Sequence, residues 1–145
     1  MLEKLSLVFS AGALGGFMNA LCYWFFGYAG ISPFFGLTGK IGWDPAHVYW
    51  GVTWGGIWGV IFLLPVLKKS VVLRGLIFSL GPTLVALLVV FPLKGMGLFG
   101  FNVSLLMPSL ALILNAVWGI GASIWVDAAG LFEASGKTVP AGAKT

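Results

Sequence analysis

Four long apolar stretches, separated by short segments that hold nearly all the charged residues, dominate the chain. They cover residues 5–27, 46–67, 73–93 and 103–126. A helix that crosses the hydrocarbon core of a bilayer, about 30 Å thick, needs roughly 20 apolar residues, and each stretch reaches that length. The pattern predicts an all-α membrane protein with four transmembrane helices in an antiparallel bundle and an interfacial outer loop between helices 1 and 2.

The second stretch has the clearest start signal, and the third has the least regular interior. Asp44 can accept a hydrogen bond from a free amide of the first turn, and Pro45 suits a first helical position, which needs no donor. In the third stretch Pro82 removes a backbone donor, so we expect a kink near Gly81–Pro82. Residues 1–127 then form a single transmembrane domain, and residues 128–145 form a polar cytoplasmic tail.

The composition agrees with a membrane protein. Apolar residues make up 59% of the 145 positions and charged residues only 8%, and the mean hydropathy is +1.04. Soluble globular chains are about 25% charged. The net charge of +4 is spread between apolar stretches and forms no basic face, so nucleic acid is not an expected partner. Cys22 is the only cysteine, which excludes an internal disulfide and a multi-cysteine metal site.

The distribution of the cations predicts the orientation of the chain. If every stretch crosses the bilayer once, six cations lie on one side: Lys4, Lys68, Lys69, Arg74, Lys137 and Lys144. Only Lys40 and Lys94 lie on the other side. Because cytoplasmic segments are enriched in Lys and Arg, both termini are expected in the cytoplasm, and we expect an integral protein of a bacterial inner membrane.

Small residues recur at four-residue intervals on every stretch, which lets helix backbones approach closely in lipid. The glycines expected to pack helices together are Gly12, Gly16, Gly51, Gly55, Gly59 and Gly119. Asn19 and Asn115 lie about midway along the first and fourth stretches. These amides could join helices by hydrogen bonds to each other, to Trp58 or to the backbone carbonyl freed by Pro82. The alternative is that they contact a ligand.

His47, the only histidine, lies in the first turn of the second stretch, close to Asp44. The plain interpretation is an interfacial histidine bonded to a nearby carboxylate or carbonyl. His47 is a weak candidate for metal or haem ligation, since the chain offers no second histidine, and no cofactor is required by the sequence. Trp50, Trp54 and Trp58 recur at four-residue spacing, so their indoles should form a ridge beside the glycines.

The sequence shows no constellation of catalytic residues and no phosphate-binding loop, so we do not expect an enzyme. No ionisable side chain is expected inside a span either, because Lys94 and Asp127 fall at predicted helix ends. A pump that couples transport to ions usually carries such charges at depth, which disfavours that class for a single chain.

The leading functional hypothesis is a non-catalytic membrane subunit that packs against another membrane protein and binds lipid or an apolar cofactor through its aromatic face. The alternative is a small homo-oligomeric transporter or channel, in which the amides and deep tryptophans line a path. A weaker alternative is a haem- or quinone-associated redox subunit that uses His47. The expected ligand or partner contacts are His47, Trp50, Trp54, Trp58, Asn19 and Asn115.

Overall fold

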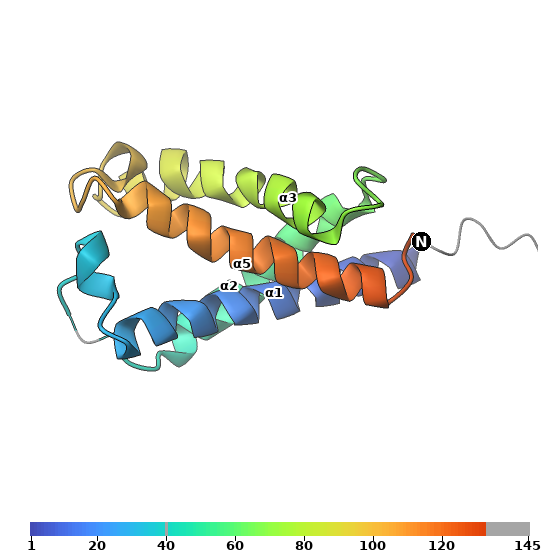
Figure 1. Ribbon diagram of the computed structural model, residues 1–145, viewed down its shortest axis with the longest axis horizontal. Helices are drawn as coiled ribbons and strands as arrows, with labels where there is room; N and C mark the ends of the chain where they lie inside the picture. The colour runs from blue at the N-terminus through green and yellow to red at the C-terminus, as the bar shows by residue number, and fades with distance from the viewer. Residues whose placement is uncertain (40, 133–145) are drawn as a thin grey trace, which may run out of the picture.

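The computed structural model describes residues 1–39 and 41–132, in which helices joined by turns and loops make up the whole fold (Figure 1). In chain order these are α1 (Leu2–Tyr28), η1 (Ser32–Phe35), α2 (Pro45–Trp58), η2 (Gly59–Leu63), α3 (Val71–Val85), η3 (Ala86–Val90), α4 (Phe91–Leu93), η4 (Leu98–Gly100) and α5 (Met107–Ala128). Most of the tail predicted for residues 128–145 lies outside the described residues.

Within residues 1–39 and 41–132, three helices are long and apolar enough to cross a membrane. They are Leu2–Tyr28 with 27 residues, Val71–Leu93 with 23 and Met107–Ala128 with 22. The second of these runs without a break through α3, η3 and α4. The prediction of a helical chain with membrane-length apolar helices is therefore confirmed. These helices are consistent with an integral membrane protein.

The helices pack in a chain of pairs in which α1 contacts both α2 and α5, and α5 contacts α3. Figure 1 shows α1, α3 and α5 side by side along the long axis, with α2 crossing behind α1. The start of α1, the start of α3 and the end of α5 gather at one end of the molecule. Since α2 rests on α1 and α3 rests on α5, these two outer helices flank a central pair.

Two helix ends differ from the predicted stretches. The second stretch was expected to continue to Leu67, but η2 ends at Leu63. The reason is Pro65, whose ring forces the preceding Leu64 into an extended conformation with ψ 123°. The fourth helix begins at Met107 rather than Val103, because residues just before it form turns and the Ser104 hydroxyl accepts a hydrogen bond from the Leu106 amide.

The kink expected near Gly81–Pro82 takes another form. Helix α3 continues through Pro82 to Val85, and the departure from α-helical geometry comes one turn later, as the π-helical segment η3. Pro82 cannot donate to the carbonyl of Phe78, so the bonding pattern of the helix has to adjust nearby. The irregular segment therefore lies in the middle of a membrane-length helix.

Glycines bring α1 and α2 into backbone contact. A Cβ added to Gly12 would overlap the carbonyl oxygen of Gly55, and one added to Gly16 would overlap that of Gly51. Gly59 meets the backbone of α1 in the same way. The sequence-predicted packing glycines of these two helices thus face one another, and any larger side chain would force the helices apart.

Helices α3 and α5 pack through a second glycine contact. The buried indole of Trp118 joins the helices at the centre of the bundle. A Cβ on Gly75 would lie 2.7 Å from the Gly119 backbone. Trp118 of α5 is 3% exposed, and its Nε1 donates to the carbonyl oxygens of Gly12 at 3.0 Å and Gly55 at 3.3 Å. Trp118 was not among the residues singled out from the sequence, yet this side chain ties α5 to both α1 and α2.

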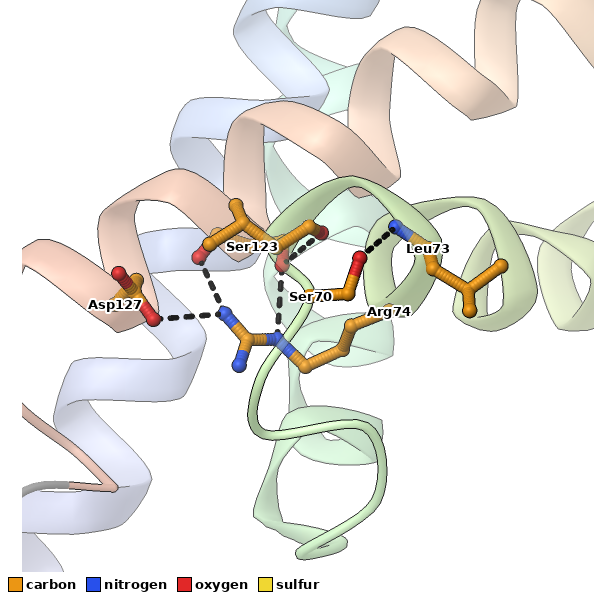
Figure 2. Close-up of polar contacts among 6 residues, drawn as sticks. Ser70, Leu73, Arg74, Ser123 and Asp127 are labelled. Atoms are coloured by element: carbon orange, nitrogen blue, oxygen red, sulfur yellow. Dashed lines mark hydrogen bonds and ion pairs between the residues drawn. The ribbon is translucent and has the colours of Figure 1, made fainter.

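Arg74 corrects the expectation that no ionisable side chain is buried. It was counted only as a cation of the cytoplasmic side, but it lies in the first turn of α3 and is 0% exposed. Figure 2 shows its Nε donating to the Ser123 hydroxyl at 2.8 Å and its Nη2 donating to the Ser123 carbonyl at 3.0 Å. Asp127 lies 3.5 Å from the same Nη2.

Candidate functional site

A groove of about 1000 Å³ lies between α2 on one side and α3 with η3 on the other. Its floor comes from α1 and α5, the central pair of helices. The walls meet at one end, where a Cβ on Gly81 would lie 3.1 Å from the ring of Trp58. From that point the groove extends toward Asp44 and Lys94. The groove exists because the two outer helices pack on the central pair and not along each other.

All six side chains expected to contact a ligand or partner line this one groove. They are His47, Trp50, Trp54, Trp58, Asn19 and Asn115. Trp50 and Trp54 of α2 remain 58% and 52% exposed, so no other part of the described chain covers their indoles. The opposite wall is apolar and consists of Pro82, Val85, Ala86 and Val90. The tryptophan ridge predicted from the spacing therefore forms one wall of this groove.

The two amides in the floor do not bond to each other as one interpretation expected. Asn19 Nδ2 donates to the carbonyl oxygen of Leu114 at 2.9 Å, which joins α1 to α5. Asn115 follows Leu114, and consecutive helical residues point about 100° apart, so its side chain lies in the groove instead of over that carbonyl. Asn19 thus has the structural role, whereas Asn115 presents a half-buried amide to the cleft.

The open end of the groove is the charged end. Asp44 caps α2, its Oδ1 accepting from the Ala46 amide at 3.0 Å, as the sequence predicts. His47 stacks on Tyr23 with ring centroids 4.5 Å apart, and in the described chain it makes none of the carboxylate or carbonyl bonds expected of it. Lys94, beyond α4, lines the groove across from His47. One carboxylate and one ammonium therefore flank the histidine.

The surroundings of His47 hold few candidate metal ligands in the described part of the chain. Across residues 1–39 and 41–132, no group of three or more His, Cys, Asp or Glu side chains is placed to hold a metal ion. His47 and Asp44 remain neighbours, but a zinc or copper site normally takes more ligands of these types.

A smaller cavity of about 280 Å³ adjoins the groove and shares Asp44 and His47 with it. Its remaining aromatic lining comes from Tyr23 and Trp24 of α1 and from Trp43. Trp24 and Trp43 near helix ends are typical of a membrane boundary, and their pattern alone indicates no cavity. In the sequence, Trp24 follows Tyr23 and Trp43 precedes Asp44, and this adjacency was the available signal of a site. The fold is needed to bring the pair on α1 next to the pair before α2.

The groove combines apolar walls, an amide at mid-length and ionisable groups at one end. This arrangement suits an elongated molecule with an apolar body and one polar end. Comparison with protein-family models, with curated proteins and with solved structures finds no match. The chemistry of the groove therefore carries the functional inference.

Proposed function

We propose that this chain is a non-catalytic integral membrane subunit that holds a lipid or an apolar cofactor in the groove between α2 and α3. In this proposal it packs against another membrane protein and crosses a bacterial inner membrane four times, with both termini in the cytoplasm. The observation that carries the proposal is the groove of about 1000 Å³, which is at the upper end of the roughly 300–1,000 Å³ typical of ligand sites.

The exposed indoles favour an apolar occupant. Trp50, Trp54 and Trp58 present a continuous aromatic wall, and at least Trp54 and Trp58 lie beyond the first turn of α2, below the depth of an interfacial aromatic belt. Hydrocarbon chains or a planar apolar ring can cover these faces by dispersion contacts. The polar groups at the open end would then hold the polar part of the same molecule.

A fourth crossing by α2 and η2 is supported by their combined length. At 1.5 Å per α-helical residue and about 2.0 Å per 3₁₀ residue, Pro45–Leu63 rises about 31 Å, which matches the hydrocarbon core. Asp44 stands at one end and the exposed pair Lys68 and Lys69 at the other. Without the buried Arg74, five cations lie on the side of the termini and two lie on the opposite side. This difference still favours a cytoplasmic location for both termini.

A surface for a partner protein is present on the outer face of α3. Leu73, Leu76, Leu80 and Leu84 recur at intervals of three or four residues and are 40–53% exposed. Residues at this spacing form one stripe along a helix, which can contact either lipid or a neighbouring helix. The proposal assigns part of this stripe to the partner subunit.

Native mass spectrometry after gentle solubilisation tests the proposal. The wild-type chain should retain about one molecule of lipid or cofactor and a stoichiometric partner polypeptide. Ala86→Phe, which fills the groove, should lose the small molecule, whereas the matched variant Leu88→Phe on an exposed position outside the groove should keep it. A wild-type chain that runs alone with nothing bound contradicts the proposal, and a bound chromophore would instead favour the redox alternative.

A further inference from the structure

The cavity beside the groove has the composition of a site for an organic ammonium group. Tyr23, Trp24 and Trp43 supply aromatic surfaces, and Asp44 supplies a carboxylate. Aromatic faces attract ammonium cations through the ring quadrupole, and clusters of such rings bind quaternary ammonium groups in particular. A carboxylate beside the rings adds a full negative charge. The cavity therefore combines the two attractions that such a cation needs.

The rings are held in place by contacts with each other. Trp24 meets Trp43 edge to face with centroids 6.2 Å apart, and it stacks on Tyr28 at 5.7 Å. Tyr23 stacks on His47 at 4.5 Å. Two rings come from α1 and the others from the start of α2 and the loop before it, so the cavity forms only when the two helices are packed. Such a preformed box loses little side-chain freedom when a ligand binds.

Asp44 retains capacity for a ligand although it caps α2. Its Oδ1 accepts one hydrogen bond from the Ala46 amide, and a carboxylate has about four lone-pair sites in all. Asp44 and His47 line both the cavity and the groove, so the two spaces adjoin at these residues. Lys94 also lines the groove. A negative charge where the cavity and the groove adjoin and a positive charge on the groove wall are thus available to one ligand.

This pair of opposite charges matches a zwitterionic phospholipid head group, in which an ammonium and a phosphate are joined by a two-carbon link. We propose that the cavity binds the ammonium of such a membrane lipid, that Lys94 faces its phosphate, and that its acyl chains lie in the groove along the tryptophans. This inference rests on the proposed function and names the ligand class. The cavity of about 280 Å³ suits a head group, whereas the groove of about 1000 Å³ suits the chains.

The position of the cavity in the fold agrees with this assignment. It lies where α1 ends and α2 begins, at the end of the molecule opposite the chain start (Figure 1). Trp24, Tyr28 and Trp43 cluster there, and aromatic side chains of this kind are enriched at head-group depth. An anionic lipid without an ammonium would place no cation near the aromatic box and would bring its charge toward Asp44.

Competition between defined lipids tests the inference on the purified full-length protein. Native mass spectrometry should show preferential retention of phosphatidylethanolamine or phosphatidylcholine over phosphatidylglycerol with the same chains. Asp44→Asn keeps a residue that caps helices well but removes the charge, and it should reduce this preference about tenfold. Trp43→Leu, at a half-exposed loop position, should reduce it similarly, whereas Trp125→Leu at the other end of the molecule should leave it unchanged.

The outcomes separate this inference from the proposed function. Equal retention of all three lipids, or an Asp44→Asn variant with wild-type preference, overturns the head-group assignment and leaves the groove proposal standing. Absence of any bound lipid or other apolar molecule overturns both. Tetramethylammonium that competes with phosphatidylcholine but not with phosphatidylglycerol supports the aromatic box, while saturable binding of that cation without any lipid binding assigns the cavity to a free ammonium compound instead.

Discussion

Replacing Ser123 with alanine should destabilise the protein more than neutralising Asp127, although Asp127 is the formal ion-pair partner of Arg74. The reason is where each group lies. The Ser123 hydroxyl is fully buried, accepts from Arg74 Nε at 2.8 Å and donates to the Val71 carbonyl at 2.7 Å. The Asp127 side chain is 51% exposed and lies 3.5 Å from Arg74 Nη2.

The structure gives a rough magnitude for each change. Ser123→Ala leaves the buried Nε of a charged guanidinium without its acceptor, which costs about 1.5–3 kcal/mol for hydrogen bonds to charged groups in soluble proteins. In membrane helices polar bonds average about 0.6 kcal/mol with a maximum near 1.7, which lowers the expected range. Asp127→Asn removes a long, half-exposed pair, for which about 0–1 kcal/mol is typical. We expect Ser123→Ala to cost about 1 kcal/mol more than Asp127→Asn.

Unfolding in mixed micelles of a mild detergent and dodecyl sulfate, followed by far-UV circular dichroism, measures this difference. Arg74→Lys serves as a third variant, because an ammonium cannot reproduce the bonds that Nε and Nη2 make to Ser123, and it should resemble Ser123→Ala. An Asp127→Asn variant that loses as much stability as Ser123→Ala would refute the reasoning, since the exposed carboxylate would then hold Arg74.

Three further predictions concern packing, the central indole and the threading of the chain. Gly55→Ala should cost about 1–3 kcal/mol in mixed-micelle unfolding, because the added Cβ meets the α1 backbone. Gly56→Ala should cost clearly less, because the atoms nearest to its added Cβ belong to the ring of half-exposed Phe9. Equal costs for the two variants would argue against backbone contact at Gly55. Trp118→Phe should lower the free energy of unfolding by about 0.6–2 kcal/mol, because the Trp118 indole donates two hydrogen bonds to other helices. Trp58→Phe should lower it much less. The reverse order would contradict the anchoring role of Trp118. In a Cys22→Ser background, an impermeant maleimide should label Lys94→Cys in intact cells and Lys69→Cys only after permeabilisation, and labelling of both from outside would exclude the proposed threading.

Sequence patterns predicted the helical membrane-length elements because these depend on local features. Apolar length, the Asp44–Pro45 start signal and small residues at four-residue spacing act within one turn or one helix. The end of η2 was also local, and attention to Pro65 would have found it. The burial of Arg74 was not predicted because it depends on Ser123, which is distant in the sequence and adjacent only after α3 packs on α5.

The groove could be anticipated only in part. Helical spacing predicted a ridge of Trp50, Trp54 and Trp58, and these side chains lie on one wall. No local pattern indicates that the opposite wall comes from α3, because this depends on which helices pack together. The ammonium cavity likewise needs α1 and the start of α2 in contact, so neighbouring residues in the sequence indicate its parts but not its existence.

The central claim, that the groove is filled by hydrocarbon and not by water, is tested most directly by a nitroxide at Ala86→Cys in a Cys22→Ser chain reconstituted in lipid. Ala86 lies on the groove wall, and Leu88→Cys on the outer surface and Lys69→Cys in the loop give the lipid and water references. The account predicts that the label at Ala86→Cys collides with a water-soluble nickel chelate as rarely as the label at Leu88→Cys. Collision at a rate near that of Lys69→Cys would show a water-filled path and contradict the account in favour of a transporter or channel.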